Sequence, residues 1–287
     1  MKTIPEITIQ NCFTIPVLGL GTWEMGGRSS ADKSEDNKWI HAIEFAIESG
    51  IRHIDTAAIY GAGHAERLVG QAIKNFDRKN LIITTKVSGD TLQFHQVLRS
   101  ADDSRKRMGI DQIDLFLLHW PNPSVPLGQT MSAVNKLLED RSVKYFGLSN
   151  FPVALINEVG FYTDAPIITN QLEYNLMNRN QGSYNQNVET EIIPYCLKKG
   201  VSITAWRPVM KGDASAIIYP LLQSLAEKYD KTVFQIALNW LISKPSMLAI
   251  PKMTSEAHIM QNIDATQFEI DQDDMLLLDN IKNTSDL

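Results

Sequence analysis

Four side chains that can move or steer a proton stand at the ends of three successive apolar segments. Asp55 and Tyr60 come at the end of IRHIDTAAIYG, Lys86 ends LIITTK, and His119 ends DLFLLH. A barrel of parallel strands brings the C-terminal ends of its strands to one rim, so residues far apart in sequence can share one pocket. The pattern therefore indicates a catalytic site built from strand ends.

Tyr60 is the candidate proton donor of this group. A phenol has a pKa of about 10 and donates poorly near neutral pH unless a neighbouring charge stabilises its anion. Lys86 can supply that charge, and a buried ammonium in turn needs a counter-charge, which Asp55 can provide. His119 could hydrogen-bond a carbonyl oxygen and orient it. Because no side chain supplies a hydride, reduction of a carbonyl would need a bound cofactor.

Each of these residues also has an ordinary structural interpretation. Taken singly, Asp55, Tyr60 and His119 could be residues of the fold, and a lysine at the end of an apolar segment usually extends its ammonium to solvent. Metal binding is a weaker use, because His53, His64 and His119 lie on separate segments without the spacing of zinc ligands. Their joint arrangement favours a catalytic role and predicts no metal site.

The elements that must position these residues form a regular alternation. Strand-like segments and amphipathic helical patterns follow one another along the chain, and such crossovers imply parallel pairing. Eight units in 287 residues match the size of a (β/α)8 TIM barrel, so we predict an α/β fold with one domain over residues 1–287. The predicted strands are PVLGLG, HIDTA, LIITTK, DLFLLH, VKYFGLS, PIITNQLE, VSITAW and MLAIPK.

Further secondary-structure elements are expected outside the eight β/α units. The opening EITIQNCFTI is typical of a β-hairpin at the barrel floor. Helical patterns run from Ile217 to Lys228, from a Thr232 cap to Ile242, and, after the last unit, over residues 271–281. The prediction therefore includes extra C-terminal helices.

A doubly wound dinucleotide-binding sheet is the alternative for the same alternation, so the glycine fingerprint matters. GAGHAE, residues 61–66, ends in Glu rather than Gly, and Gly19-Leu-Gly21 is followed by Thr-Trp-Glu. A nicotinamide cofactor would therefore not be held by the usual pyrophosphate loop. These glycines could serve turn geometry or ligand binding.

Composition limits the classes of partner. The net charge of -6 leaves no basic excess for the phosphates of nucleic acid. Cys12 and Cys196 form no disulfide framework or metal-ligand spacing. The N-terminus is too polar for a signal peptide, and no apolar run approaches the ~20 residues of a membrane span. We therefore expect a cytoplasmic protein that binds neither nucleic acid nor a membrane.

The sequence resembles the aldo-keto reductase family from about Val17 to Phe268. The matching motifs are GLGTW (19–23), DTA and YG (55–61), TK (85–86), LHWP (118–121), GLSNF (147–151), NQ and YN (170–175), and IPK (250–252). The resemblance implies a (β/α)8 barrel that binds NADPH or NADP+ without a Rossmann domain. The implied activity is the reversible reduction of aldehydes, ketones or sugar carbonyls to alcohols, with a small-molecule carbonyl compound as substrate.

The resemblance also assigns roles by position. Tyr60 matches the general acid, Lys86 and Asp55 match the residues that tune it, and His119 matches the residue that orients the carbonyl. The implied cofactor contacts are Gly21, Thr22, Asp55, Ser149, Asn150, Gln171, Trp206, Arg207, Lys252, Thr254, Ser255, His258 and Asn262, and the implied substrate wall contains Trp23, Trp120 and residues 122–129.

Three residues depart from the family pattern. A tyrosine usually stacks on the nicotinamide, but here the run is Trp206-Arg207-Pro208. Trp206 can stack equally well, whereas Arg207 could reach the pyrophosphate or pair with an acidic side chain on the surface. His258 replaces an arginine that usually clamps the 2′-phosphate beside Lys252. A neutral imidazole lacks the fork and permanent charge of arginine, so we expect weak discrimination for NADPH and use of NADH as well.

A cofactor-sensing protein on the same barrel, resembling the potassium-channel β subunits, is the alternative function. The fold does not distinguish the two, but a protein that only binds cofactor needs no proton donor. The complete set of Asp55, Tyr60, Lys86 and His119 therefore favours an enzyme. The short tail, residues 283–287, predicts an open pocket suited to small aldehydes, aldoses or keto-sugars.

Overall fold

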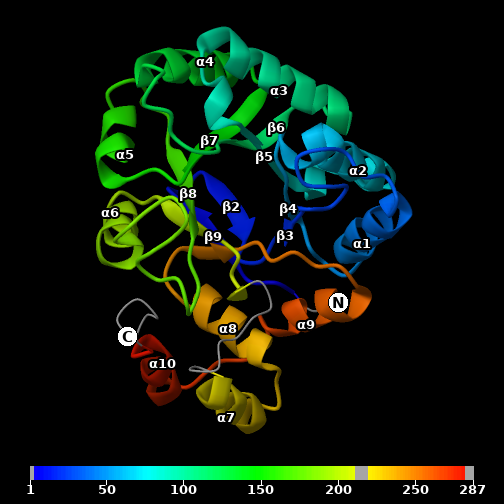
Figure 1. Ribbon diagram of the computed structural model, residues 1–287, viewed down its shortest axis with the longest axis vertical. Coiled ribbons are helices and arrows are strands. Elements are labelled where there is room, and N and C mark those ends of the chain that lie inside the picture. The colour runs from blue at the N-terminus through cyan, green and yellow to red at the C-terminus, as the bar shows by residue number, and fades with distance from the viewer. Residues whose placement is uncertain (1–2, 211–218, 282–287) are drawn as a thin grey trace.

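The computed structural model describes residues 3–210 and 219–281, and Figure 1 shows its strands as a ring surrounded by helices. Eight strands pair in parallel and in chain order. They are β3 (Leu20–Gly21), β4 (His53–Asp55), β5 (Ile82–Val87), β6 (Ile113–Leu118), β7 (Val143–Ser149), β8 (Ile167–Glu173), β9 (Ser202–Trp206) and β10 (Met247–Ala249). Each predicted strand segment overlaps one of these, so the predicted α/β barrel is confirmed.

The first and last strands close the barrel. The backbone N–H of Gly19 donates to the carbonyl of Ala249 at 2.9 Å, and that of Gly21 donates to the carbonyl of Pro251 at 3.0 Å. A Cβ on Gly21 would lie 2.5 Å from the carbonyl oxygen of Ile250. Glycine at position 21 therefore allows the close approach of two backbones, which is a structural role for this part of the GLG motif.

The N-terminal hairpin covers one end of the barrel. Strands β1 (Glu6–Ile9) and β2 (Phe13–Pro16) pair antiparallel. Phe13 and Ile15 pack in one buried cluster with Leu115 and Leu248, which lie near the starts of β6 and β10. The hairpin thus covers the N-terminal end of the strands, as predicted, and Figure 1 shows β2 within the outline of the ring. The C-terminal end of the strands is not covered by this hairpin.

Helices cover the outside of the barrel because their apolar faces pack on the sheet. In α1, for example, Trp39, Ile43 and Ala46 are buried. The helices are α1 (Asp36–Glu48), α2 (His64–Ala72), α3 (Phe94–Met108), α4 (Leu127–Glu139), α5 (Val153–Val159), α6 (Ile193–Lys198), α7 (Tyr219–Tyr229), α8 (Val233–Ile242), α9 (Glu256–Asp264) and α10 (Gln272–Asp279). Within residues 3–210 and 219–281, none has the length and apolar character that crossing a membrane requires.

The predicted additional helices are present with small differences in their bounds. Thr232 caps α8, since its hydroxyl accepts from the N–H of Gln235 and the Gln235 side chain accepts from the N–H of Thr232. Asp271 caps α10 in the predicted tail segment. The predicted start at Ile217 and the tail over 283–287 lie outside the described residues.

Candidate active site

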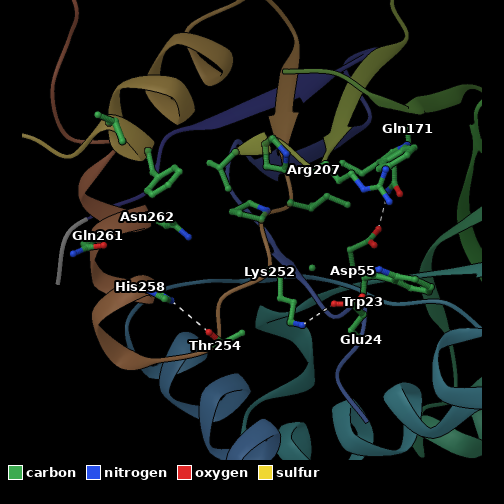
Figure 2. Close-up of a pocket in the computed structure, with 18 of the residues that line it drawn as sticks. Trp23, Glu24, Asp55, Gln171, Arg207, Lys252, Thr254, His258, Gln261 and Asn262 are labelled. Carbon is green, nitrogen blue, oxygen red and sulfur yellow. Dashed lines mark hydrogen bonds and ion pairs between the residues drawn. The ribbon is translucent and has the colours of Figure 1, made fainter. Parts of the chain in front are cut away.

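A cavity of about 1330 Å³ opens at the C-terminal rim of the barrel, and Figure 2 shows part of its lining as sticks. Most of the residues predicted to bind cofactor or substrate line this one cavity. They are Gly21, Trp23, Asp55, Tyr60, His119, Trp120, Ser149, Asn150, Gln171, Trp206, Arg207, Lys252, Thr254, His258 and Asn262.

Lys86 lies beneath the cavity and hydrogen-bonds the residues at its base. The side chain is fully buried, and Nζ donates to Asp55 Oδ1 at 2.5 Å, to the Thr56 carbonyl at 2.8 Å and to the Tyr60 hydroxyl oxygen at 3.4 Å. An ammonium has three N–H donors, so these contacts use all of them. Burial on its own would lower the pKa of Lys86, but Asp55 and Tyr60 raise it, and the side chain stays charged.

Tyr60 presents its hydroxyl to the cavity from a tight turn, Tyr60–Gly63, that follows β4. Gly61 has a φ of 55°, and a Cβ there would lie 2.4 Å from the Gly26 carbonyl oxygen, so the turn needs glycine. Because Lys86 donates to the Tyr60 oxygen, the hydroxyl hydrogen of Tyr60 has to point elsewhere. It is therefore available to a group in the cavity.

The pKa of Tyr60 differs from the sequence-based expectation. Burial raises it above the ordinary value of 10, and the charge of Lys86 offsets only part of that increase. Lys86 acts in the predicted direction, yet desolvation of the phenolate outweighs it. Tyr60 is consequently a neutral, proton-carrying group throughout the physiological pH range.

His119 stands beside Tyr60 at the end of β6. The two rings meet edge to face with their centroids 5.7 Å apart. Burial, and then the positive charge of Lys86, hold the pKa of His119 well below its ordinary value, so the imidazole is neutral. Its Nδ1 atom is buried without a hydrogen-bond partner among the described residues. A neutral imidazole can hydrogen-bond a carbonyl oxygen without adding a charge to the site.

Asp55 is held on both carboxylate oxygens. Oδ1 accepts from Lys86, and Oδ2 accepts from Gln171 Nε2 at 2.8 Å. Thr22 differs from its expected place as a cofactor contact: its side chain is fully buried, and its hydroxyl donates to the Asp55 carbonyl at 3.0 Å. The Thr22 hydroxyl therefore supports the end of β4 instead of lining the cavity.

Three polar residues gather at the ends of β7 and β8. The Asn150 amide nitrogen donates to the His119 carbonyl and to Ser149 Oγ, both at 3.0 Å, and its oxygen accepts from Trp206 Nε1 at 3.3 Å. Asn150 thus holds the His119 backbone, the Ser149 hydroxyl and the Trp206 ring in place. The Ser149 hydroxyl hydrogen and the side-chain oxygen Oε1 of Gln171 make no hydrogen bond within the described chain. Both residues border the cavity, where these groups suit an amide group of a ligand.

Arg207 pairs with an acidic side chain, which is one of the two expected alternatives. Its Nη1 lies 2.9 Å from Glu173 Oε1, and its guanidinium lies 4.8 Å from the centre of the Trp206 ring. The acid is buried, not on the surface: Glu173 is 4% exposed. Burial acts to raise the pKa of Glu173, but hydrogen bonds from Ser183 and Arg207 lower it below its ordinary value.

The far end of the cavity carries more exposed charges. Lys252 Nζ lies 3.2 Å from Glu24 Oε2, as Figure 2 shows, and Glu24 also pairs with Arg28 at 2.7 Å. Thr254 Oγ1 and His258 Nδ1 are 3.4 Å apart.

Ser255 caps a helix, in addition to its predicted role as a cofactor contact. Its hydroxyl accepts from the backbone N–H of His258 and caps α9, and the residue is not among those that line the cavity. The capping bond uses the Ser255 oxygen as an acceptor and leaves the hydroxyl hydrogen without a partner in the described chain, so a contact with a cofactor stays a prediction.

Several cavity residues escaped the sequence analysis. Glu24 directly follows the GLGTW motif and Arg28 comes four residues later, and the charge of Glu24 next to that motif was a usable signal. Tyr184 lies in QGSYNQN, a polar stretch without periodicity. Conversely, residues 122–129 were expected to form part of the substrate wall but do not line this cavity. Asn122 Nδ2 instead donates to the Gly89 carbonyl at 2.9 Å.

Comparison with known proteins decides the family. Residues 17–283 match the model described as "Aldo/keto reductase family". The chain belongs to the aldo-keto reductase family. It is 30% identical to the glyoxal reductase of Bacillus subtilis, over 95% of this chain and 91% of that protein.

Solved structures agree with this assignment. A thermostable aldo-keto reductase, Tm1743, superimposes with a TM-score of 0.92 at 35% identity, covering 97% of this chain and all of that one. A Klebsiella pneumoniae aldo-keto reductase in complex with NADPH gives 0.86 at 27% identity, covering 96% and 94%. The protein is therefore an NAD(P)H-dependent oxidoreductase that acts on carbonyl groups, as the sequence predicted.

Proposed function

We propose that this aldo-keto reductase reduces small aldehydes and α-dicarbonyl compounds with Tyr60 as the general acid. The observation that carries the proposal is the hydrogen bond from Lys86 to the Tyr60 oxygen, because it leaves the phenolic hydrogen for the cavity. The neutral state of Tyr60 keeps that hydrogen in place at neutral pH. The similarity to a glyoxal reductase supports a small carbonyl substrate.

The residues of the cavity fit a nicotinamide dinucleotide. Ser149 and Gln171 offer a donor and an acceptor for a carboxamide, and Trp206 offers an aromatic face beside them. Beyond them, Lys252 and the N-terminus of α9 provide positive charge and dipole for a phosphate. Bound there, the cofactor supplies the hydride that the carbonyl carbon accepts.

The protein's own groups handle the proton and the carbonyl oxygen. Tyr60 donates its hydrogen to that oxygen and becomes a phenolate, and the carbonyl becomes an alcohol. Lys86 stabilises the phenolate through the hydrogen bond it already makes, with Asp55 fixing the ammonium. Neutral His119 hydrogen-bonds the same oxygen and orients it beside Tyr60. In the oxidative direction the phenolate takes the proton back.

The charges at the far end support use of NADH in addition to NADPH. The ion pair between Glu24 and Lys252 places a carboxylate where a 2′-phosphate would meet the lysine. His258 provides no permanent charge to compensate. We expect the kcat/KM ratio of NADPH to NADH to stay within about a hundredfold. A ratio of several thousand would show that another group clamps the phosphate.

The substitution Tyr60→Phe tests the proposal. Turnover of methylglyoxal should fall by about a hundredfold to ten-thousandfold, because only the proton donor is removed. The NADPH dissociation constant, followed by fluorescence, should stay within about twofold. Tyr162→Phe, an exposed tyrosine next to α5, is the matched control. Unchanged turnover in Tyr60→Phe would contradict the proposal, and a wild-type protein that binds NADPH but reduces no carbonyl would favour the sensing alternative.

A further inference from the structure

Tyr184 stands at the mouth of the cavity, on the segment after β8. Its ring stacks on Trp120 with centroids 6.1 Å apart and planes 14° apart. It meets Trp206 edge to face at 6.4 Å. Trp120 in turn lies 4.7 Å from the ring of His119. Tyr184 therefore completes an aromatic wall that runs from the proton-donating end of the cavity to the ring proposed to face the nicotinamide.

This tyrosine is held in place although it is exposed. Glu173 Oε2 accepts from the Ser183 N–H at 2.7 Å and from the Ser183 hydroxyl at 2.6 Å. The same carboxylate pairs with Arg207, and it is almost fully buried. Two hydrogen bonds from one residue to a buried carboxylate fix the backbone immediately before Tyr184.

The exposure of Tyr184 points to a ligand. The residue is 57% exposed, yet it lines the cavity and contacts two tryptophans. An aromatic face that stays open to water in a cavity gains free energy when an apolar group covers it. A small dicarbonyl such as methylglyoxal has almost no apolar surface with which to cover that face. A carbonyl compound that carries a phenyl group or a longer apolar chain can do so.

We propose that Tyr184 is a specificity residue that selects carbonyl substrates with an aromatic or extended apolar group, and that Glu173 and Ser183 are its positioning residues. The inference rests on the carbonyl-reductase function proposed above. Tyr184 touches the part of the substrate remote from the carbonyl. It therefore affects the binding of large substrates and leaves the proton transfer from Tyr60 unchanged.

The test compares two substrates in the Tyr184→Ala enzyme. For 3-phenylpropanal, kcat/KM should fall about tenfold through KM, because an aromatic contact is lost. For methylglyoxal, which has no aromatic or extended apolar group, the fall in kcat/KM should be about fivefold smaller than for 3-phenylpropanal. Tyr184→Phe should retain the wild-type values for both substrates, since it keeps the ring. Tyr162→Ala is the control for removing an exposed tyrosine elsewhere.

Ser183→Ala tests the positioning. It removes one of the two bonds to Glu173, so KM for 3-phenylpropanal should rise about threefold with kcat unchanged, and Ser183→Thr should restore it. Equal losses for both substrates in Tyr184→Ala, or no loss for either, would overturn the inference. Failure of the wild-type enzyme to reduce methylglyoxal and 3-phenylpropanal would instead contradict the proposed function.

Discussion

The two ends of the cavity hold their charges in different ways. At the proton-donating end, the ion pair of Lys86 and Asp55 is buried, with side-chain exposures of 0% and 2%. At the far end, the pair of Lys252 and Glu24 is about one-third exposed on each side. A buried pair is costly to break because it leaves an uncompensated charge, whereas an exposed pair contributes little. The charges that support proton transfer are therefore in place before any ligand binds. At the far end, Lys252 can exchange Glu24 for a phosphate of the ligand.

The largest effect should come from breaking the buried pair. Lys86→Met removes the bond to Tyr60 and leaves Asp55 without its counter-charge. We expect kcat to fall at least about a hundredfold and the free energy of unfolding to fall by about 3–5 kcal/mol. Steady-state kinetics and denaturant unfolding measure the two quantities.

A double variant separates these two effects. Lys86→Met combined with Asp55→Asn removes both charges, so it should recover part of the lost stability while turnover stays low. Recovery of turnover in the double variant would show that the Lys86 ammonium has no part in catalysis.

A smaller effect should come from the exposed pair. Glu24→Gln removes the carboxylate that competes with a 2′-phosphate for Lys252. The kcat/KM ratio of NADPH to NADH should rise about fivefold, the size expected for a partly exposed ion pair, with the NADH value unchanged. Glu35→Gln breaks the exposed pair with Lys38, and neither residue lines the cavity, so it is the matched control. An unaltered ratio would mean that Glu24 and the phosphate do not share Lys252.

The same contrast explains what could be predicted from the sequence. Asp55, Lys86 and His119 lie at strand ends, and Tyr60 lies in the turn that follows β4. Strand periodicity locates strand ends, so their gathering at one rim followed from the pattern. The sequence did not indicate that the hydroxyls of Thr22 and Ser255 bond to a strand end and cap a helix, because local backbone geometry decides such bonds.

Other features depend on long-range packing. The sequence left two interpretations of Arg207 open. Its partner Glu173 lies on β8, and only the pairing register of β8 with β9 brings the two residues together. Tyr184 escaped notice because its segment has no periodicity and is placed by one buried carboxylate. For Tyr60, the sequence indicated the sign of the Lys86 effect but not the extent of burial, which sets the net shift in pKa.

The pH dependence of the reduction step tests the account most directly, because it identifies the proton donor. Single-turnover rates of methylglyoxal reduction by the wild-type enzyme should be constant from about pH 6 to pH 9. They should fall only above about pH 10, because Tyr60 carries a raised pKa and donates until it ionises. A rate that instead falls steadily as pH rises from about 6 to about 9 would assign the proton to His119, whose pKa lies well below its ordinary value, and would contradict the account.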